Sequence, residues 1–450
     1  MTAVREAGVS TFEMYIDGRW TAAESGETFR SEDPYTGEAW AELPKAGPTD
    51  VDRAVTAARR AFDEGPWRRT NPMQREALLL KIADLIEKHG QELAELETLD
   101  NGKTIFESRN VDIPGAAATF RYYAGWATKI TGETNPTDES FFSYTLREPV
   151  GVCGQIIPWN FPLLMAAWKL APALACGNTL VLKPAEQTPL TALRLGELLL
   201  EAGVPPGVVN IVPGFGETAG RALVRHPLVD KIAFTGSTEV GKEIQREAAG
   251  TLKRVSLELG GKSPNIVFAD ADMSDAAQGA LLGVFFNQGQ VCCAGTRLFV
   301  EKKVHDDFVG TLAEAAKTMK QGSGLESDSR IGPLVSKEQL DRVTSYLDVG
   351  KKEGAKAVIG GERNTEKGLE KGYFVKPTIF TGVNNGMRIA REEIFGPVVS
   401  VIPFKDENDA VLQGNDTTYG LAAGVWTRDV SKAHRVARAI RAGTVWVNCY

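Results

Sequence analysis

The sequence predicts an α/β protein with parallel sheets that helices cover on both faces, divided between two lobes. Short apolar segments alternate with helical patterns from Val150 onward, and the same alternation resumes after Asn265. The chain has 450 residues, which is more than a single hydrophobic core usually accommodates. The segment 259–261, Leu-Gly-Gly, separates the two alternating regions, so we expect the boundary between the lobes there.

Composition argues against several functional classes. The chain has 43% hydrophobic and 24% charged residues and a net charge of −7, with acids and bases interspersed, which argues against a nucleic-acid or membrane partner. No apolar run approaches the roughly 20 residues that span a bilayer. The first residues lack a signal-peptide pattern, so we expect a cytoplasmic protein. The 5 cysteines and 4 histidines match neither a disulfide framework nor a zinc site, so no metal is expected.

The first part of the chain is expected to contain strands and then helices. Residues 11–46 carry turn signals and are predicted to be irregular or strand-like. Asp50 is placed to cap a helix whose apolar face begins at Val51, and Asn71-Pro72 opens a second helix that Gly90 is expected to end. Apolar and polar residues then alternate over 142–146, which predicts a half-exposed strand. Such a strand is either an ordinary sheet edge or an arm that pairs with another subunit.

The alternating regions supply the parallel sheets, whose carboxyl ends commonly bind ligands. Strands are predicted at 150–157, 178–182, 208–212, 231–235 and 252–257, with helices near 163–176, 189–202, 218–225 and 240–249. In the second lobe, strands are predicted at 265–268, 298–300, 357–359, 398–402, 423–426 and 444–447. The last strand ends on apolar residues at Tyr450, so we expect a further segment to follow in the natural protein.

Two adjacent cysteines follow an apolar segment and a short turn that contains glycine. Cys292 and Cys293 are succeeded by small residues, which would let a substrate or a backbone approach the sulfurs closely. Taken alone, both cysteines are more readily explained as small packing residues. A reactive thiol is the alternative, and no histidine lies nearby in the sequence to assist it.

Polar residues at the predicted strand ends are candidates for binding a dinucleotide. The segment from Gly236 to Glu243 nearly matches a phosphate-binding P-loop, but Glu243 stands where a magnesium-binding hydroxyl belongs, which disfavours a triphosphatase. This turn either holds a pyrophosphate or is an ordinary strand-to-helix turn. Lys183 and Glu186 could donate to and accept from ribose hydroxyls, and an acid there favours NAD over NADP; otherwise they are solvated surface residues.

Two further residues could carry catalysis. Asn160 follows the first strand of the alternating region and offers an amide donor suited to an oxyanion, although asparagine is also common in turns. Glu258 lies between leucines at a strand end, so partial desolvation would raise its pKa toward use as a general base. The alternative for Glu258 is a structural carboxylate paired with a lysine or arginine.

Six segments, taken together and in this order, resemble the NAD(P)-dependent aldehyde dehydrogenase superfamily, most nearly the branch that oxidises general aliphatic and aromatic aldehydes (EC 1.2.1.3). They are 158–162 (PWNFP), 182–186 (LKPAE), 234–239 (FTGSTE), 257–264 (LELGGKSP), 288–292 (QGQVC) and 392–397 (EEIFGP). The resemblance covers nearly the whole chain.

The resemblance implies a role for each matching residue. Cys292 would be the nucleophile, Glu258 would activate water to hydrolyse the thioester, Asn160 would stabilise the oxyanion and Lys169 would relay protons. The cofactor, NAD in preference to NADP, would be bound by Ile156, Ile157, Pro158, Trp159, Lys183, Glu186, Gly216, Phe234, Gly236, Ser237, Glu393 and Phe395. The substrate tunnel would be lined by Phe161, Trp168 and Phe286.

The resemblance also implies the domain organisation. A Rossmann-like NAD-binding domain would comprise residues 1–126 and 150–258, a protruding β-hairpin at 127–149 would serve oligomerisation, and an α/β catalytic domain would comprise 259–450. A homo-oligomer, dimer or tetramer, is expected for a full-length chain. Two alternatives remain: an aldehyde dehydrogenase that acylates coenzyme A, and a non-catalytic binding or structural protein that retains the fold.

Overall fold

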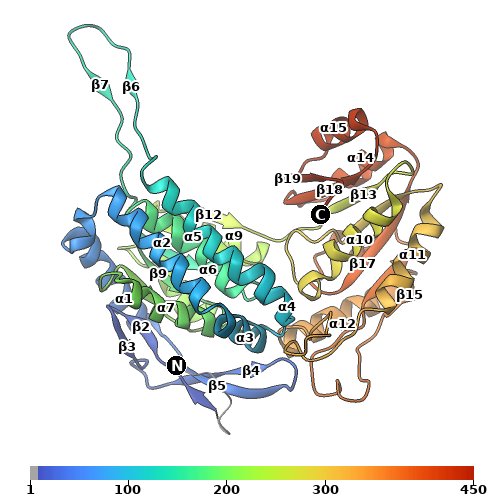
Figure 1. Cartoon of the computed structure of the whole chain (residues 1–450), viewed down its shortest axis with the longest axis horizontal. Helices are drawn as coiled ribbons and strands as arrows, with labels where there is room; N and C mark the ends of the chain where they lie inside the picture. The colour runs from blue at the N-terminus through green and yellow to red at the C-terminus, as the bar shows by residue number, and fades with distance from the viewer. Residues whose placement is uncertain (1–8) are drawn as a thin grey trace. The chain divides into compact units, whose positions relative to one another are not determined.

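The computed structural model describes residues 9–450, which form two compact α/β units (Figure 1). Unit 1 comprises the described residues up to Glu32, together with Ala39–Asp100 and Phe106–Glu258. Unit 2 comprises Asp33–Glu38, Asn101–Ile105 and Leu259–Tyr450. The chain therefore passes from the main part of unit 1 into the main part of unit 2 directly after Glu258.

Unit 1 is built on a seven-stranded sheet of order β12-β11-β8-β9-β10-β2-β3. Its strands are β2 (Met14–Ile16), β3 (Arg19–Thr21), β8 (Val152–Ile156), β9 (Thr179–Lys183), β10 (Val209–Ile211), β11 (Lys231–Thr235) and β12 (Arg254–Glu258). The five strands from β12 to β10 are parallel, as predicted, and β2 and β3 add an antiparallel edge. β8, β9 and β10 are buried throughout, which explains why most of their residues are apolar.

Helices pack on this sheet and on one another. They are α1 (Pro48–Asp63), α2 (Pro72–Lys88), α3 (Gly90–Asn101), α4 (Ile105–Glu107), α5 (Ile113–Ala127), α6 (Pro162–Ala175), α7 (Leu190–Ala202), α8 (Arg221–Arg225) and α9 (Thr238–Ala248). The Asn71 cap is confirmed, since its side chain accepts a hydrogen bond from the Gln74 N–H at 2.9 Å.

Two of the predicted helix ends are wrong. Asp50 lies inside the first turn of α1, where its carboxylate accepts a hydrogen bond from the Gly47 N–H at 2.9 Å, so the helix begins two residues before Asp50. Gly90 does not end α2; it opens α3, and α2 stops at Lys88. A carboxylate in the first helical turn and one at the cap both serve the same unpaired N–H groups, which is why sequence alone confuses them.

Two smaller sheets complete unit 1. β1 (Ser10–Thr11), β5 (Glu38–Pro44) and β4 (Thr28–Asp33) form one, and β6 (Thr134–Asn135) pairs with β7 (Ser143–Tyr144) in a hairpin that projects away from the rest of the unit (Figure 1). The predicted half-exposed strand at 142–146 is wrong in extent, because only two residues pair. It is also wrong in burial: Phe142 is 78% exposed and Leu146 71% exposed.

Unit 2 contains a second seven-stranded sheet, of order β15-β16-β17-β14-β13-β18-β19. The strands are β13 (Pro264–Val267), β14 (Arg297–Glu301), β15 (Lys356–Ile359), β16 (Thr378–Thr381), β17 (Val398–Phe404), β18 (Ala422–Trp426) and β19 (Thr444–Val447). All are parallel except β15. β16 was not predicted, since its four residues between Pro377 and Gly382 are too few to show a pattern.

Helices cover both faces of this sheet. They are α10 (Met273–Phe285), α11 (His305–Lys317), α12 (Lys337–Lys352), α13 (Arg388–Arg391), α14 (Glu407–Asn415) and α15 (Val430–Ala439). Two apolar clusters result, one around Phe299 and Phe380 and one around Phe285 and Trp426. Across residues 9–450, we find no helix with the length and apolarity needed to cross a membrane. The same residues contain no group of three acidic, histidine or cysteine side chains placed to hold a metal.

Candidate active site

In unit 1 the candidate residues gather at the carboxyl ends of four adjacent strands. Four strands, β12, β11, β8 and β9, are neighbours in the sheet. Each one ends at, or is followed by, residues that the sequence predicts to be functional. Parallel strands direct their carboxyl ends to one edge, so loops that are distant in the sequence meet there. Ile156 and Ile157, at the end of β8, are buried, and the Ile157 N–H donates to the Lys183 carbonyl at 3.2 Å.

The loop after β8 carries the proposed oxyanion donor. Asn160 is only 4% exposed, while Pro158 and Trp159 are half-buried. α6 begins at Pro162, directly after this loop, because proline fits the first helical position. Phe161 is buried and Trp168, on the second turn of α6, is 53% exposed.

The loop after β9 pairs a lysine with a glutamate. The Lys183 ammonium donates to Glu186 Oε2 at 2.9 Å, and the lysine side chain is 3% exposed against 27% for the glutamate. The pair therefore presents a fixed donor beside a partly exposed acceptor. Vicinal ribose hydroxyls, which both donate and accept, match such a pair.

The loop after β11 forms the turn into α9. The Phe234 ring lies over Gly236, where a Cβ would collide with it, so glycine is required by the close approach. Ser237 caps α9 by accepting a hydrogen bond from the Val240 N–H at 3.3 Å, and both residues are exposed. The helix N-terminus is thus accessible and partly positive, as an anion site requires. Gly216, the first residue of a π-helical turn at Gly216–Gly220, is exposed, with open space where a Cβ would stand.

A lysine and a glutamate lie at the end of the β11–β12 pair. The Lys169 ammonium donates to the Thr235 hydroxyl at 2.8 Å, and Thr235 is in register with Glu258. Burial lowers the pKa of Lys169 to about 8, while the Glu258 carboxylate opposes that shift. The prediction that Glu258 is partly desolvated is wrong, because β12 is an edge strand and the side chain is exposed.

In unit 2 the two cysteines lie in the loop that precedes β14. Both are half-buried free thiols. The turn before them is strained: Asn287 and Gln288 have φ of 48° and 57°. A Cβ at Gly289 would collide with the Gly396 carbonyl, so the backbones approach closely there. The sequence had predicted a polar turn that contains glycine, and this prediction is confirmed.

The two thiols influence each other's ionisation. Their hydrogen bond, followed by burial and the nearby Glu393 carboxylate, raises the pKa of Cys292. The same hydrogen bond lowers the pKa of Cys293. Cys292 is therefore a thiol at neutral pH in this state, and its proton must move before the sulfur attacks a carbonyl.

Tyr450 anchors the cysteine loop, and sequence reasoning missed it. Its hydroxyl donates to the Cys293 carbonyl at 2.7 Å. The ring occupies a slot in which a Cβ at Gly283, Gly295 or Gly424 would clash or press against it. Three glycines on α10, the cysteine loop and β18 converge only in the folded chain, so no local pattern could have revealed the slot.

The glycine pair at the start of unit 2 contacts a candidate cofactor residue. The Gly261 N–H donates to Glu393 Oε1 at 3.0 Å, and a Cβ at Gly260 would collide with the same carboxylate. A Cβ at Gly261 would also collide with the Cys292 carbonyl. The loop before β13 therefore lies between the cysteine loop and the Glu393 loop. Phe395, half-buried with φ of 64°, and Phe286, half-buried after α10, complete the set in this unit.

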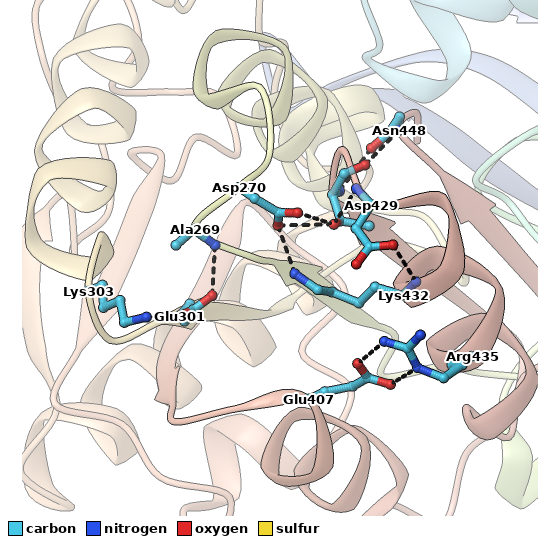
Figure 2. Close-up of polar contacts among 10 residues, drawn as sticks. Ala269, Asp270, Glu301, Lys303, Glu407, Asp429, Lys432, Arg435 and Asn448 are labelled. Atoms are coloured by element: carbon cyan, nitrogen blue, oxygen red, sulfur yellow. Dashed lines mark hydrogen bonds and ion pairs between the residues drawn. The ribbon is translucent and has the colours of Figure 1, made fainter.

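The opposite, carboxyl edge of the unit 2 sheet carries a different set of polar residues (Figure 2). Asp270, which follows β13, accepts hydrogen bonds from the Thr427 hydroxyl at 2.8 Å and from the Lys432 ammonium at 3.0 Å. Glu407 and Arg435 form a bidentate pair at 2.7 and 2.8 Å. These charges are paired with one another at the surface of the unit.

Comparison with known proteins identifies close relatives. A family model described as "Aldehyde dehydrogenase family" matches residues 20–450. DhaS of Bacillus subtilis (strain 168) is 58% identical over 98% of this chain and 88% of its own length. Human mitochondrial aldehyde dehydrogenase is 53% identical over 97% of this chain and 84% of its own length. The solved structure of an NAD+ complex of aldehyde dehydrogenase from Bacillus cereus superposes with a TM-score of 0.96, at 51% identity, over 98% of this chain and 89% of that chain.

Proposed function

Because the chain belongs to the aldehyde dehydrogenase family, we propose that it oxidises a small aldehyde to the carboxylic acid with NAD as oxidant. The observation that carries the proposal is the Cys292 loop: a half-buried free thiol on a strained turn, in a chain of this family. A cysteine is intrinsically a strong nucleophile once deprotonated, and strained backbone is concentrated at functional sites.

The proposed chemistry forms and breaks one carbon–sulfur bond. The Cys292 thiol first loses its proton to solvent, and Sγ then attacks the aldehyde carbonyl to form a thiohemiacetal, whose oxyanion we assign to the Asn160 amide and the Cys292 N–H. NAD, when bound, supplies the hydride acceptor that converts this adduct into a thioester. Glu258 then takes a proton from water, the water oxygen attacks the thioester carbonyl, and the carbon–sulfur bond breaks to release the acid. We assign the relay of protons away from the site to Lys169, whose lowered pKa of about 8 suits transfer near neutral pH.

The residues at the carboxyl edge of unit 1 fit a dinucleotide. The accessible N-terminus of α9, with Gly236 and Ser237, would hold the pyrophosphate, and Lys183 with Glu186 would hold the adenosine ribose. The negative Glu186 disfavours a 2′-phosphate, which supports NAD over NADP. Further contacts are assigned to Ile156, Ile157, Pro158, Trp159, Gly216 and Phe234, and the nicotinamide ribose to Glu393 and Phe395.

The proposal extends to the domains. Residues 1–126 and 150–258 would bind NAD, 259–450 would carry the nucleophile, and Phe161, Trp168 and Phe286 would line the substrate tunnel. We assign the hairpin 127–149 to assembly of a homo-oligomer, because Phe141, Phe142 and Leu146 are each more than 70% exposed.

An aldehyde panel with NAD and with NADP tests this function. We expect NADH to form from NAD and several aldehydes without coenzyme A, and lower activity with NADP. Turnover that requires coenzyme A would replace hydrolysis with acyl transfer. If no aldehyde is oxidised with either cofactor while the protein still binds NAD, the chain is a non-catalytic member of the family.

A further inference from the structure

Unit 1 contains a cavity of about 420 Å³ that the proposed reaction does not use. It lies at the β3 edge of the sheet, between residues 11–13, α3 and α7, whereas the candidate cofactor loops follow β8, β9 and β11. Its volume falls within the range of sites that bind small molecules. The lining consists of Thr11, Phe12, Glu13, Trp20, Glu92, Leu96, Leu190, Leu193, Arg194 and Glu197.

One wall of this cavity is apolar and firmly positioned. Leu96, Leu190 and Leu193 are each at most 6% exposed, so they belong to the packed interior. Trp20 packs against Tyr15 with ring centroids 5.1 Å apart, and its indole lies over Gly196 of α7, where a Cβ would approach it to 3.3 Å. A large aromatic face is thus held in place before any ligand arrives.

The other wall carries an excess of negative charge. Arg194 donates to Glu92 at 2.8 and 3.0 Å and to Glu197 at 2.6 Å, so its guanidinium is occupied by two of the three lining carboxylates. The Arg194 side chain is only 12% exposed. The third carboxylate, Glu13, has no ion-pair partner within residues 9–450. Three acids against one base leave the lining with a formal charge of −2.

We infer that this cavity binds an organic ammonium ion with an apolar body. The apolar part would pack on the leucines, and the cation would lie between the Glu13 carboxylate and the Trp20 face, since a tryptophan ring attracts cations through its negative π face. The excess of carboxylates repels anions. A neutral ligand of the same shape would gain the apolar contacts but neither electrostatic contribution.

Calorimetric titration with 2-phenylethylammonium, at low ionic strength, tests this site. Binding is expected for the wild-type protein, and at least tenfold weaker binding for 2-phenylethanol and for 3-phenylpropanoate. Glu13→Gln removes the unpaired charge at an exposed position and should weaken binding of the ammonium ion about threefold. Trp20→Leu removes the aromatic face and should weaken it about tenfold. Leu193→Trp should fill the cavity and abolish binding.

The variants also locate the bound ion. Glu13, Trp20 and Leu193 have no part in the proposed reaction, so aldehyde oxidation should continue in variants that have lost the ammonium site. If Leu193→Trp fails to fold, Glu13→Gln and Trp20→Leu decide the result. Equal affinity in wild type and in both of these variants would place the ligand elsewhere, and absence of any binding heat at millimolar ligand would overturn the inference. Because only binding is read out, the test is independent of whether the aldehyde is oxidised.

Discussion

The two units have sheets of similar construction, yet their candidate functional residues lie at opposite edges. In unit 1, the segments with Asn160, Lys183 and Ser237 follow parallel strands, so they lie at the carboxyl edge. In unit 2, the loops with Cys292 and Glu393 precede β14 and β17, so they lie at the amino edge. The carboxyl edge of unit 2 carries the ion pairs of Figure 2 instead.

The difference shows that the function of a sheet edge depends more on the chemical groups found there than on whether the strands begin or end at that edge. At the carboxyl edge of unit 1, a turn into a helix exposes N–H groups that have no partner within the helix, which is what a phosphate needs. At the carboxyl edge of unit 2, the Asp270 and Glu407 carboxylates already have Lys432 and Arg435 as partners of opposite charge. The amino edge of unit 2 has backbone at positive φ in Asn287, Gln288 and Phe395, and strained backbone of this kind is concentrated at functional sites.

Replacing the nucleophile should have the largest effect on turnover. A small effect would contradict the assignment of the chemistry to the amino edge of unit 2. Cys292→Ala removes the protein atom that is proposed to bond to the aldehyde carbon, so turnover should fall by at least about 10⁴-fold. NADH formation is the measurement, and the matched control is Cys293→Ala. We expect Cys293→Ala to retain most of the activity, because that thiol acts only through its hydrogen bond to Cys292. Equal losses of activity in the two variants would contradict the assignment of Cys292 as the nucleophile.

Glu258→Gln tests whether the end of β12 contributes to the second half of the reaction. The amide cannot accept a proton from water, so steady-state turnover should fall about 10²–10³-fold. A rapid first burst of NADH, close to one per active site, should remain, because thioester formation does not need this carboxylate. Stopped-flow absorbance separates the two phases. Loss of the burst together with the steady state would assign Glu258 to the first step instead.

Asn160→Ala tests the carboxyl end of β8. Loss of one oxyanion donor typically costs about 10²–10³-fold in rate, and we expect the burst phase itself to slow by that amount. NAD affinity, measured by fluorescence quenching, should change little, since the cofactor is assigned to other residues. Asn160→Asp is the matched control of similar size: it replaces the donor with a charge and should be at least as slow.

Much of this arrangement could be predicted from the sequence, and the failures share a physical cause. Parallel strands buried on both faces, such as β9 with its central Leu-Val-Leu, can be predicted because burial on both faces favours consecutive apolar residues. The candidate site residues within the six motif segments could be identified because the residues next to them in the sequence complete each motif. The exposure of Glu258, the slot for Tyr450 and the charge-bearing cavity near Trp20 depend on strand order and on segments far apart in the chain, which local patterns do not encode.

Tyr450→Phe should have an intermediate effect on kcat, and it tests whether Tyr450 positions the cysteine loop at the amino edge of unit 2. The ring still fills the glycine-lined slot, but the 2.7 Å hydrogen bond to the Cys293 carbonyl is lost. We expect kcat to fall about tenfold, which corresponds to the free energy of roughly one hydrogen bond between uncharged groups, and KM to change less than twofold. The rate of Cys292 alkylation should change in parallel. Trp446→Phe, which alters the ring beside Tyr450 but keeps the phenol, is the control and should leave both rates nearly unchanged.

Asp270→Asn should have the smallest effect on activity, because the carboxyl edge of unit 2 is structural in this comparison. Burial opposes ionisation of Asp270, but the Thr427 hydroxyl and the Lys432 ammonium outweigh it and lower its pKa. A carboxyl group whose pKa is lowered by folding stabilises the protein above its unfolded pKa, near 4, and loses that contribution as pH falls through the folded value.

At pH 7 we therefore expect the Asp270→Asn variant to melt about 2 °C below wild type, with unchanged kcat for aldehyde oxidation. The difference in melting temperature should shrink as the pH is lowered below about 4, where the wild-type carboxylate also loses its charge. Thermal unfolding at several pH values measures this difference. A loss of kcat without a change in melting temperature would mean that this edge also takes part in the reaction, and the contrast between the two sheets would fail.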